Sequence, residues 1–262
     1  MTSTHPEIHG DCDPRFQAVR DALANNFATH DELGSAVTVY HEGQKVVDLW
    51  GGHMDAARSK PWREDTLCIM YSIAKSICAT SVHILADRGL VDLEAPVADY
   101  WPEFAQNGKE GVLVRHIISH NCGVCFADAT EAGDVYNYDR MIAALEVQAP
   151  AWPAGSRGAY NTVNIGFLAG EVVRRVTGTP IPQFVQENIC GPLGVDYQIG
   201  VREEDLDRVA DLQPNPAGSA MAAQAAAGET PLSRAWRPNP KPMNTDVQNS
   251  REFRTAGIPS FG

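Results

Sequence analysis

The sequence predicts an α+β fold in which a β-hairpin near the N-terminus precedes a series of helices. Two β-rich runs, Ala36–Tyr40 and Lys45–Trp50, flank a short polar turn that contains Gly43, a pattern typical of a hairpin. From Ser72 onward, apolar residues recur at helical spacing in several segments. The chain has 262 residues, of which 44% are hydrophobic, so it can bury a substantial core.

The helices are expected in the following order. The first covers Asp13–Ala28, and the second runs from Ser72 to about Arg88, where Gly89 stops it. A proline-broken turn and a short helix are expected in LVDLEAPVADYWPEF. Further helices are predicted at Val112–Ser119, Tyr138–Val147, Asn164–Thr177 and Ile181–Asn188.

The C-terminal part of the chain is richer in proline than the rest and lacks regular apolar periodicity. Prolines punctuate it from Glu203 onward, so we expect residues 203–262 to be irregular, apart from a helix that can form at Ala220–Ala227. No internal repeat divides the chain, and residues 1–262 are expected to form a single domain.

Charge and composition exclude several classes of function. The net charge of −12 argues against nucleic-acid binding, which needs a basic face. The start, MTSTHPEIHGDCDP, is polar, and the longest apolar stretches are too short to span a membrane. Six cysteines spread over this length do not form the pattern of a small disulfide scaffold. We therefore expect a cytoplasmic protein with reduced thiols and no membrane partner.

Ser72 and Lys75 form an S-x-x-K pair at the start of a predicted helix. Residues three apart share one helix face, and first-turn N–H groups point outward from the helix end. Ser72 Oγ would attack a carbonyl, Lys75 would take its proton if its pKa is held down, and the Ser72 N–H would face the oxyanion. The alternative is a serine that only caps the helix.

The surrounding segments resemble the penicillin-recognising serine hydrolases, which include class C β-lactamases, D,D-peptidases and family VIII carboxylesterases. The resemblance is carried by MYSIAKSICAT, GLVDLEAPVADYWPEF and VRHIISHNCG in that order, and it covers roughly residues 15–200. WGGHMDAARSKPW and AYNTVNIGFLAGEVVRRVTGTPIPQFVQENICGPLGV are similar to the esterase branch in particular. The resemblance implies a β-lactamase/transpeptidase-like fold and a serine hydrolase that cleaves small carboxylic esters through an acyl-enzyme on Ser72.

The same resemblance implies a third catalytic residue. The family's tyrosine motif matches Tyr160-Asn161-Thr162, with Thr162 where the family usually has asparagine. Tyr160 would relay the proton between Ser72 and the leaving group, and Lys75 would be the base. The predicted catalytic residues are thus Ser72, Lys75 and Tyr160, and no metal or organic cofactor is implied.

The family's third motif, a Lys-Thr-Gly or its esterase equivalent on a C-terminal strand, has no counterpart in the sequence. The C-terminal sheet strands are also absent, so the hairpin is expected to lack partners, and a lone hairpin is marginal in water. Three explanations compete. The chain is a fragment, or a short variant completed by another chain or as a homo-oligomer, or a helix-dominated structure that has lost the activity.

Other functions stay open at this point. One is a β-lactamase or D,D-peptidase that hydrolyses amides, and another is a truncated, non-catalytic or assembly-dependent scaffold. A third is a redox or zinc site at Cys122-Gly-Val-Cys125, which has His116 and His120 just before it. Its less specific interpretation, small residues in a loop that borders the cleft, is favoured.

Overall fold

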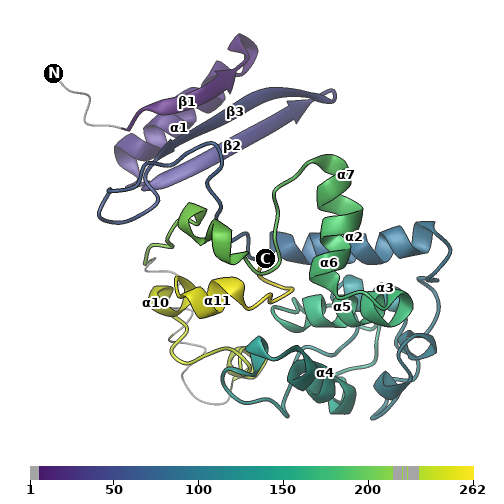
Figure 1. Cartoon of the computed structure of the whole chain (residues 1–262). Helices are drawn as coiled ribbons and strands as arrows, with labels where there is room; N and C mark the ends of the chain where they lie inside the picture. Colours follow the sequence, from purple (N-terminus) through teal and green to yellow (C-terminus); the bar gives the residue numbers. More distant parts are fainter. Residues whose placement is uncertain (1–5, 215–219, 221–222, 224–229) are drawn as a thin grey trace. The chain divides into compact units, whose positions relative to one another are not determined.

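The computed structural model describes residues 6–214, 220, 223 and 230–262. The chain divides into two compact units: Met1–Ile69 with Glu204–Gln213, and Met70–Glu203 with Pro214–Gly262. Figure 1 shows the first unit as a small sheet with a helix and the second as a group of helices. The α+β prediction is confirmed, while the prediction of a single domain stays a prediction.

The first unit contains an antiparallel sheet with the strand order β1-β3-β2. Strand β2 (Gly34–His41) and strand β3 (Gln44–Gly52) form the predicted hairpin, with Val37 opposite Leu49. Strand β1 (Ile8–Cys12) pairs with the other edge of β3. The expectation that the hairpin lacks partners was therefore wrong, because β1 is polar and was not recognised as a strand.

Helix α1 (Gln17–Thr29) packs against this sheet (Figure 1) and follows a 3₁₀ turn at Pro14–Phe16. The predicted helix at Asp13–Ala28 is thus confirmed, except that its first turn is 3₁₀ and not α-helical. Asp13 caps the turn by accepting a hydrogen bond from Arg15 N at 2.9 Å. The core of the unit consists of residues from the helix and the central strand, namely Leu23, Phe27, Val46, Val47 and Leu49.

The second unit is built around helix α5 (Asn164–Thr177), in which every residue from Asn164 to Val173 is buried. Helix α5 contacts helices α2 (Ile73–Asp87), α3 (Val114–Ile118), α4 (Tyr138–Val147) and α6 (Ile181–Val185). The predicted helices at these positions are confirmed. A π-helical turn (Gln186–Cys190) and the one-turn helix α7 (Gly191–Leu193) continue α6. Short 3₁₀ turns lie at Val97–Asp99, Pro102–Phe104, Asp134–Tyr136 and Glu203–Arg208.

The C-terminal part is more regular than expected. It forms the short helices α9 (Pro231–Ala235), α10 (Thr245–Gln248) and α11 (Arg251–Thr255). Asn244 and Ser250 cap the last two by accepting hydrogen bonds from Val247 N and Phe253 N. The helix expected at Ala220–Ala227 falls mostly outside the described residues.

The last five residues, Ile258–Gly262, pack on the start of α5. Ser260 is fully buried, and its Oγ donates to Val163 O and accepts from Gly166 N at 3.0 Å. A Cβ at Gly166 would lie 2.5 Å from Ser260 Oγ and 2.7 Å from the Pro259 carbonyl carbon. Glycine at position 166 therefore permits the close approach of this segment to the helix.

Replacing Gly166 with alanine is expected to destabilise the protein. The new methyl group meets rigid backbone, and overpacking costs about 1–3 kcal/mol, more than the roughly 1 kcal/mol that alanine gains over glycine in a helix. Gly111→Ala is the control, because that site is open and has an ordinary φ. Urea unfolding followed by circular dichroism measures both, and a Gly166→Ala protein as stable as wild type would contradict the packing described here.

The hairpin turn provides a second test. Glu42 and Gly43 both have positive φ, 51° and 76°, as a type I′ turn requires. Asparagine tolerates this conformation better than glutamate does. Glu42→Asn is therefore expected to stabilise the protein by about 0.5 kcal/mol and Glu42→Val to destabilise it, as measured by urea unfolding. The reverse order of stabilities would show that the turn is built differently.

Candidate active site

The three predicted catalytic residues meet in the helical unit. Tyr160 OH donates a hydrogen bond to Ser72 Oγ at 2.6 Å, and Lys75 Nζ lies 3.4 Å from the same oxygen. Ser72 is the N-cap residue of α2, but its side chain makes no capping hydrogen bond. The simple capping interpretation of Ser72 is therefore not supported, since its hydroxyl is held between the phenol and the amine.

A strained turn presents Ser72. Tyr71, the preceding residue, has φ 46°, a left-handed conformation that is unfavourable for a bulky side chain. The Tyr71 ring packs edge-on against the Phe261 ring, with 5.9 Å between centroids, which helps to hold this conformation. Ile73 N and Ala74 N donate to Met70 O and Tyr71 O at 3.2 and 2.9 Å. Those two N–H groups are therefore engaged within the turn.

Lys75 is nearly buried, with 5% of its surface exposed. This loss of hydration lowers the pKa of the Lys75 ammonium from 10.5 to about 8, while the nearby Cys78 has a smaller opposing effect. The amine also donates to the backbone carbonyl of Ser260 at 3.2 Å and lies 5.5 and 5.9 Å from the ring centroids of Tyr160 and Phe261. These contacts favour the charged amine, but desolvation is the larger effect.

The carbonyl of Ser260 and the rings of Phe261 and Tyr71 are parts of the site that the sequence did not reveal. A backbone oxygen has no residue-type signature, and the segment GIPSFG lies in the region expected to be irregular. A second missed residue is His120, whose ring lies against the ring of Tyr160 with centroids 4.7 Å apart. In the sequence, His120 lies in VRHIISHNCG, one of the segments that carry the family resemblance, and its only suggested role is as a neighbour of Cys122 and Cys125 in the less favoured zinc or redox interpretation.

The two cysteines near His116 and His120 are buried side chains that pack in the interior of the helical unit. Cys122 and Cys125 are buried and free, and burial raises the pKa of both thiols, that of Cys122 to about 12. Nδ1 of His116 accepts from Leu113 N. Across residues 6–214 and the other described positions, no group of three or more His, Cys, Asp or Glu is arranged to hold a metal ion. The redox and zinc alternatives therefore find no support.

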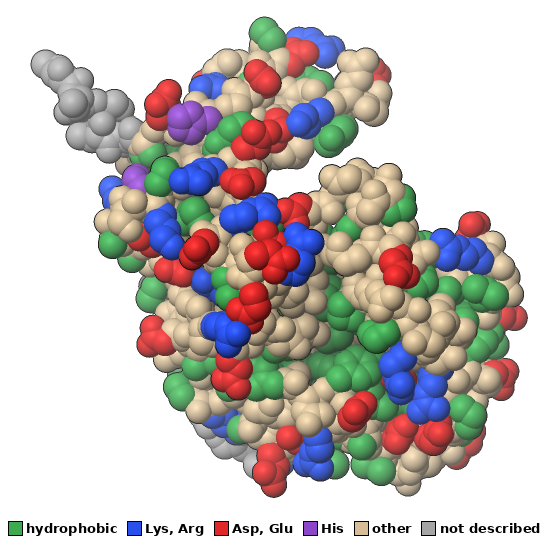
Figure 2. All heavy atoms as spheres, in the orientation of Figure 1, with side chains coloured by type: hydrophobic (Ala, Val, Ile, Leu, Met, Phe, Trp, Pro, Cys, Tyr) green, Lys and Arg blue, Asp and Glu red, His purple; other side chains and the backbone are tan. Residues whose placement is uncertain are grey.

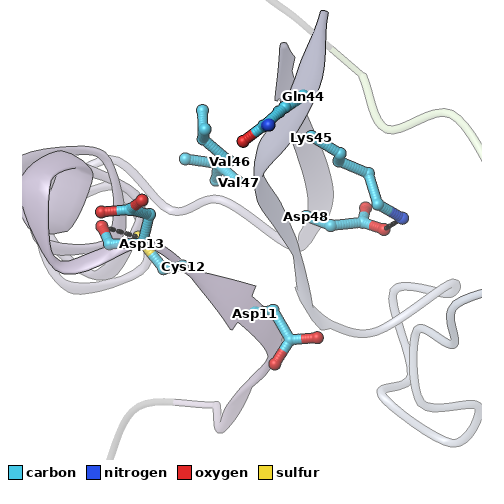
Figure 3. Close-up of a pocket in the computed structure, with 8 residues that line it drawn as sticks. All are labelled: Asp11, Cys12, Asp13, Gln44, Lys45, Val46, Val47 and Asp48. Atoms are coloured by element: carbon cyan, nitrogen blue, oxygen red, sulfur yellow. Dashed lines mark hydrogen bonds and ion pairs between the residues drawn. The ribbon is translucent and has the colours of Figure 1, made fainter. Parts of the chain in front are cut away.

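A separate hollow of about 300 Å³ lies in the sheet unit (Figure 3). Two of the three acidic residues that line it form ion pairs, Asp13 with Arg15 and Asp48 with Lys45. It contains no predicted catalytic residue. It is lined by residues of β1, β3 and the turn before α1, namely Asp11, Cys12, Asp13, Gln44, Lys45, Val46, Val47 and Asp48.

On the face seen in Figure 2, basic and acidic side chains are interspersed. Among the described residues, no helix is long and apolar enough to cross a membrane.

Comparison with known proteins identifies the family of the chain. Residues 19–240 match the beta-lactamase family. The esterase/beta-lactamase LipL of Mycobacterium tuberculosis is 37% identical over 189 residues, which are 72% of this chain and 44% of that protein. Esterase EstB of Burkholderia gladioli is 28% identical over 205 residues, 70% of this chain and 52% of that protein. The chain thus spans about half the length of these curated relatives.

Solved structures agree with the sequence comparison. A family VIII carboxylesterase superposes with a TM-score of 0.83 at 40% identity, and a penicillin-binding protein homologue from Caulobacter crescentus with 0.85 at 37%. Each match covers 98% of this chain and 67% of the other. The chain therefore has the β-lactamase/transpeptidase-like fold and corresponds to about two thirds of each of those chains. From its fold and its sequence, the chain belongs to the beta-lactamase family.

Proposed function

We propose that this protein is a serine hydrolase that cleaves small carboxylic esters through an acyl-enzyme on Ser72. The observation that carries the proposal is the position of Ser72 Oγ, 2.6 Å from Tyr160 OH and 3.4 Å from Lys75 Nζ. Relatives named esterase and carboxylesterase support the choice of ester over lactam. The name of the Mycobacterium tuberculosis relative also includes beta-lactamase, which keeps amide hydrolysis as the alternative.

In the first half-reaction, Ser72 Oγ bonds to the ester carbonyl carbon while its proton passes to neutral Lys75. The Ser72 N–H donates to the resulting oxyanion. When the C–O bond of the ester breaks, the departing alkoxide takes a proton from Tyr160, which Lys75 reprotonates. Because Tyr160 OH already donates to Ser72 Oγ, the Ser72 hydrogen is directed toward Lys75.

In the second half-reaction, water attacks the acyl carbon and gives a proton to the Lys75–Tyr160 pair. Ser72 leaves as the hydroxyl when that proton returns to Oγ, and the acid is released. A pKa of about 8 gives Lys75 about 300-fold more free base at neutral pH than an ordinary lysine has. Desolvation of the amine is thus what makes this residue a competent base.

Substitution of the three residues tests the mechanism on p-nitrophenyl butyrate, with nitrocefin assayed in parallel. Ser72→Ala is expected to abolish turnover, and Tyr160→Phe to lower kcat by about 10²–10⁴-fold, the usual contribution of an acid–base group. Ester hydrolysis that survives Ser72→Ala would exclude the proposed nucleophile. A folded wild-type protein that hydrolyses neither compound would favour the scaffold alternative.

The pH dependence tests the role of Lys75. Burial lowers the pKa of Lys75, so the free base accumulates as pH rises through about 8, and kcat/KM is expected to rise with it. Lys75→Arg keeps a cation at all accessible pH values and should remove the rise together with the activity. A rate that falls between pH 7 and 9, or one that rises only near 10.5, would contradict a neutral Lys75.

The remaining predictions concern the surroundings of the protein. The six free cysteines suit a reducing compartment such as the cytoplasm. Assembly into a homo-oligomer stays a prediction.

A further inference from the structure

The loop that carries Tyr160 is attached to one residue, His120, on both sides of the tyrosine. Ala159 N donates to the carbonyl oxygen of His120 at 3.1 Å, and Asn161 N donates to its imidazole Nδ1 at 2.9 Å. Between these two hydrogen bonds, the imidazole and phenol rings lie 4.7 Å apart and are tilted by 37°. His120 therefore contacts three consecutive residues of the loop.

Tyr160 needs such support because it has little packing of its own. Its side chain is 57% exposed, yet its hydroxyl must stay within hydrogen-bonding distance of Ser72 Oγ. Asn161, in contrast, is buried and is fixed by bonds to Val124 O and from Asn164 N at 3.0 and 3.1 Å. The anchoring of the phenol thus depends on its neighbours in the loop and on the imidazole beside it.

The backbone of His120 is suited to this position. Its φ of 62° is left-handed, a conformation in which histidine, asparagine and aspartate are enriched. The next residue continues the attachment, since Gly155 N donates to Asn121 O at 2.9 Å. The end of helix α3 thereby holds the loop from Gly155 to Asn161.

We propose that His120 is a positioning residue for Tyr160 and that it acts only as the neutral imidazole with its proton on Nε2. The proposal rests on the proposed function, in which Tyr160 relays the proton. In this role His120 acts through Tyr160 and the residues on either side of it, not on the reacting atoms.

The protonation state follows from the hydrogen bond. Nδ1 accepts from Asn161 N, whereas an imidazolium donates from both nitrogens and has no acceptor left. The Tyr160 phenol lies against this ring, and Lys75 on α2 is a charged group close enough to act on it. Burial and, to a smaller extent, Lys75 lower the pKa of His120 below 6.5. The hydrogen bond from Asn161 N to Nδ1 is therefore intact at neutral pH. It is lost when the pH falls below the pKa of His120.

Two substitutions separate the parts of this contact. His120→Asn offers an acceptor near the place of Nδ1 and tolerates left-handed φ, but lacks the ring. His120→Phe keeps a ring and loses the acceptor. We expect His120→Phe to lower kcat on p-nitrophenyl butyrate by about 10–100-fold with little change in KM, and His120→Asn to stay within about 10-fold of wild type. The exposed His30→Asn is the matched control and should change nothing.

The pH profile provides a readout that a purely structural role would not change. In wild type, log(kcat/KM) should have a slope of one below pH 8, where Lys75 titrates, and should steepen toward two over about one to two pH units below the pKa of His120, the span that matches a 10–100-fold loss. In His120→Asn the slope should stay one throughout. Full activity of His120→Phe, or a slope of two that persists in His120→Asn, would overturn the proposal.

A measurement without catalysis separates this proposal from the proposed function. In the NMR spectrum of ¹⁵N-labelled wild-type protein, the Asn161 amide signal should shift with the titration of the His120 imidazole below pH 6.5, and Nδ1 should be the unprotonated nitrogen above it. An Asn161 amide that does not respond would overturn the attachment even in an active enzyme. A responsive amide in a protein without esterase activity would leave the attachment standing and remove the proposed function alone.

Discussion

The removal of Lys75 from water is the constraint on which the candidate site depends. An amine in bulk water stays protonated at neutral pH and cannot accept a proton from serine. Here Lys75 is 5% exposed, its amine lies 5.5 and 5.9 Å from the ring centroids of Tyr160 and Phe261, and its pKa is lowered to about 8. The backbone oxygen of Ser260 partly compensates for the lost hydration. As a result, the charged and neutral forms of the amine are both populated near pH 8.

Three segments that are distant in the sequence create this environment. The strained turn at Tyr71 begins helix α2 and presents Ser72, the loop from Gly155 to Asn161 brings the phenol, and Ile258–Gly262 covers the amine. The C-terminal segment is held in place by the start of helix α5, which accommodates Ser260 because glycine occupies position 166. Buried packing in the helical unit therefore has a chemical consequence at Ser72, since a displaced C-terminal segment would let water reach Lys75.

Much of this arrangement could be predicted from the sequence, and the missing parts share a physical reason. Helices with clear apolar periodicity and glycine stops, such as α2 and α5, were predicted closely. Ser72, Lys75 and Tyr160 were found because their side chains form a motif in a recognisable order. Strand β1 was missed because IHGDC is polar, with Gly10 in its centre. Ser260 was missed because it acts on Lys75 through its carbonyl, an atom that every residue has. His120 was missed because it contacts a loop around Tyr160 that is distant in the sequence.

Direct titration of the Lys75 side chain tests the central claim. In protein labelled with ¹³C-lysine, the Lys75 side-chain signals can be assigned by their absence from Lys75→Arg and followed through the pH range in NMR spectra. A midpoint near 8 is predicted from the burial of the amine. A midpoint near 10.5, the value of an ordinary lysine, would show that the amine is hydrated and charged at neutral pH and is not the base that Ser72 needs.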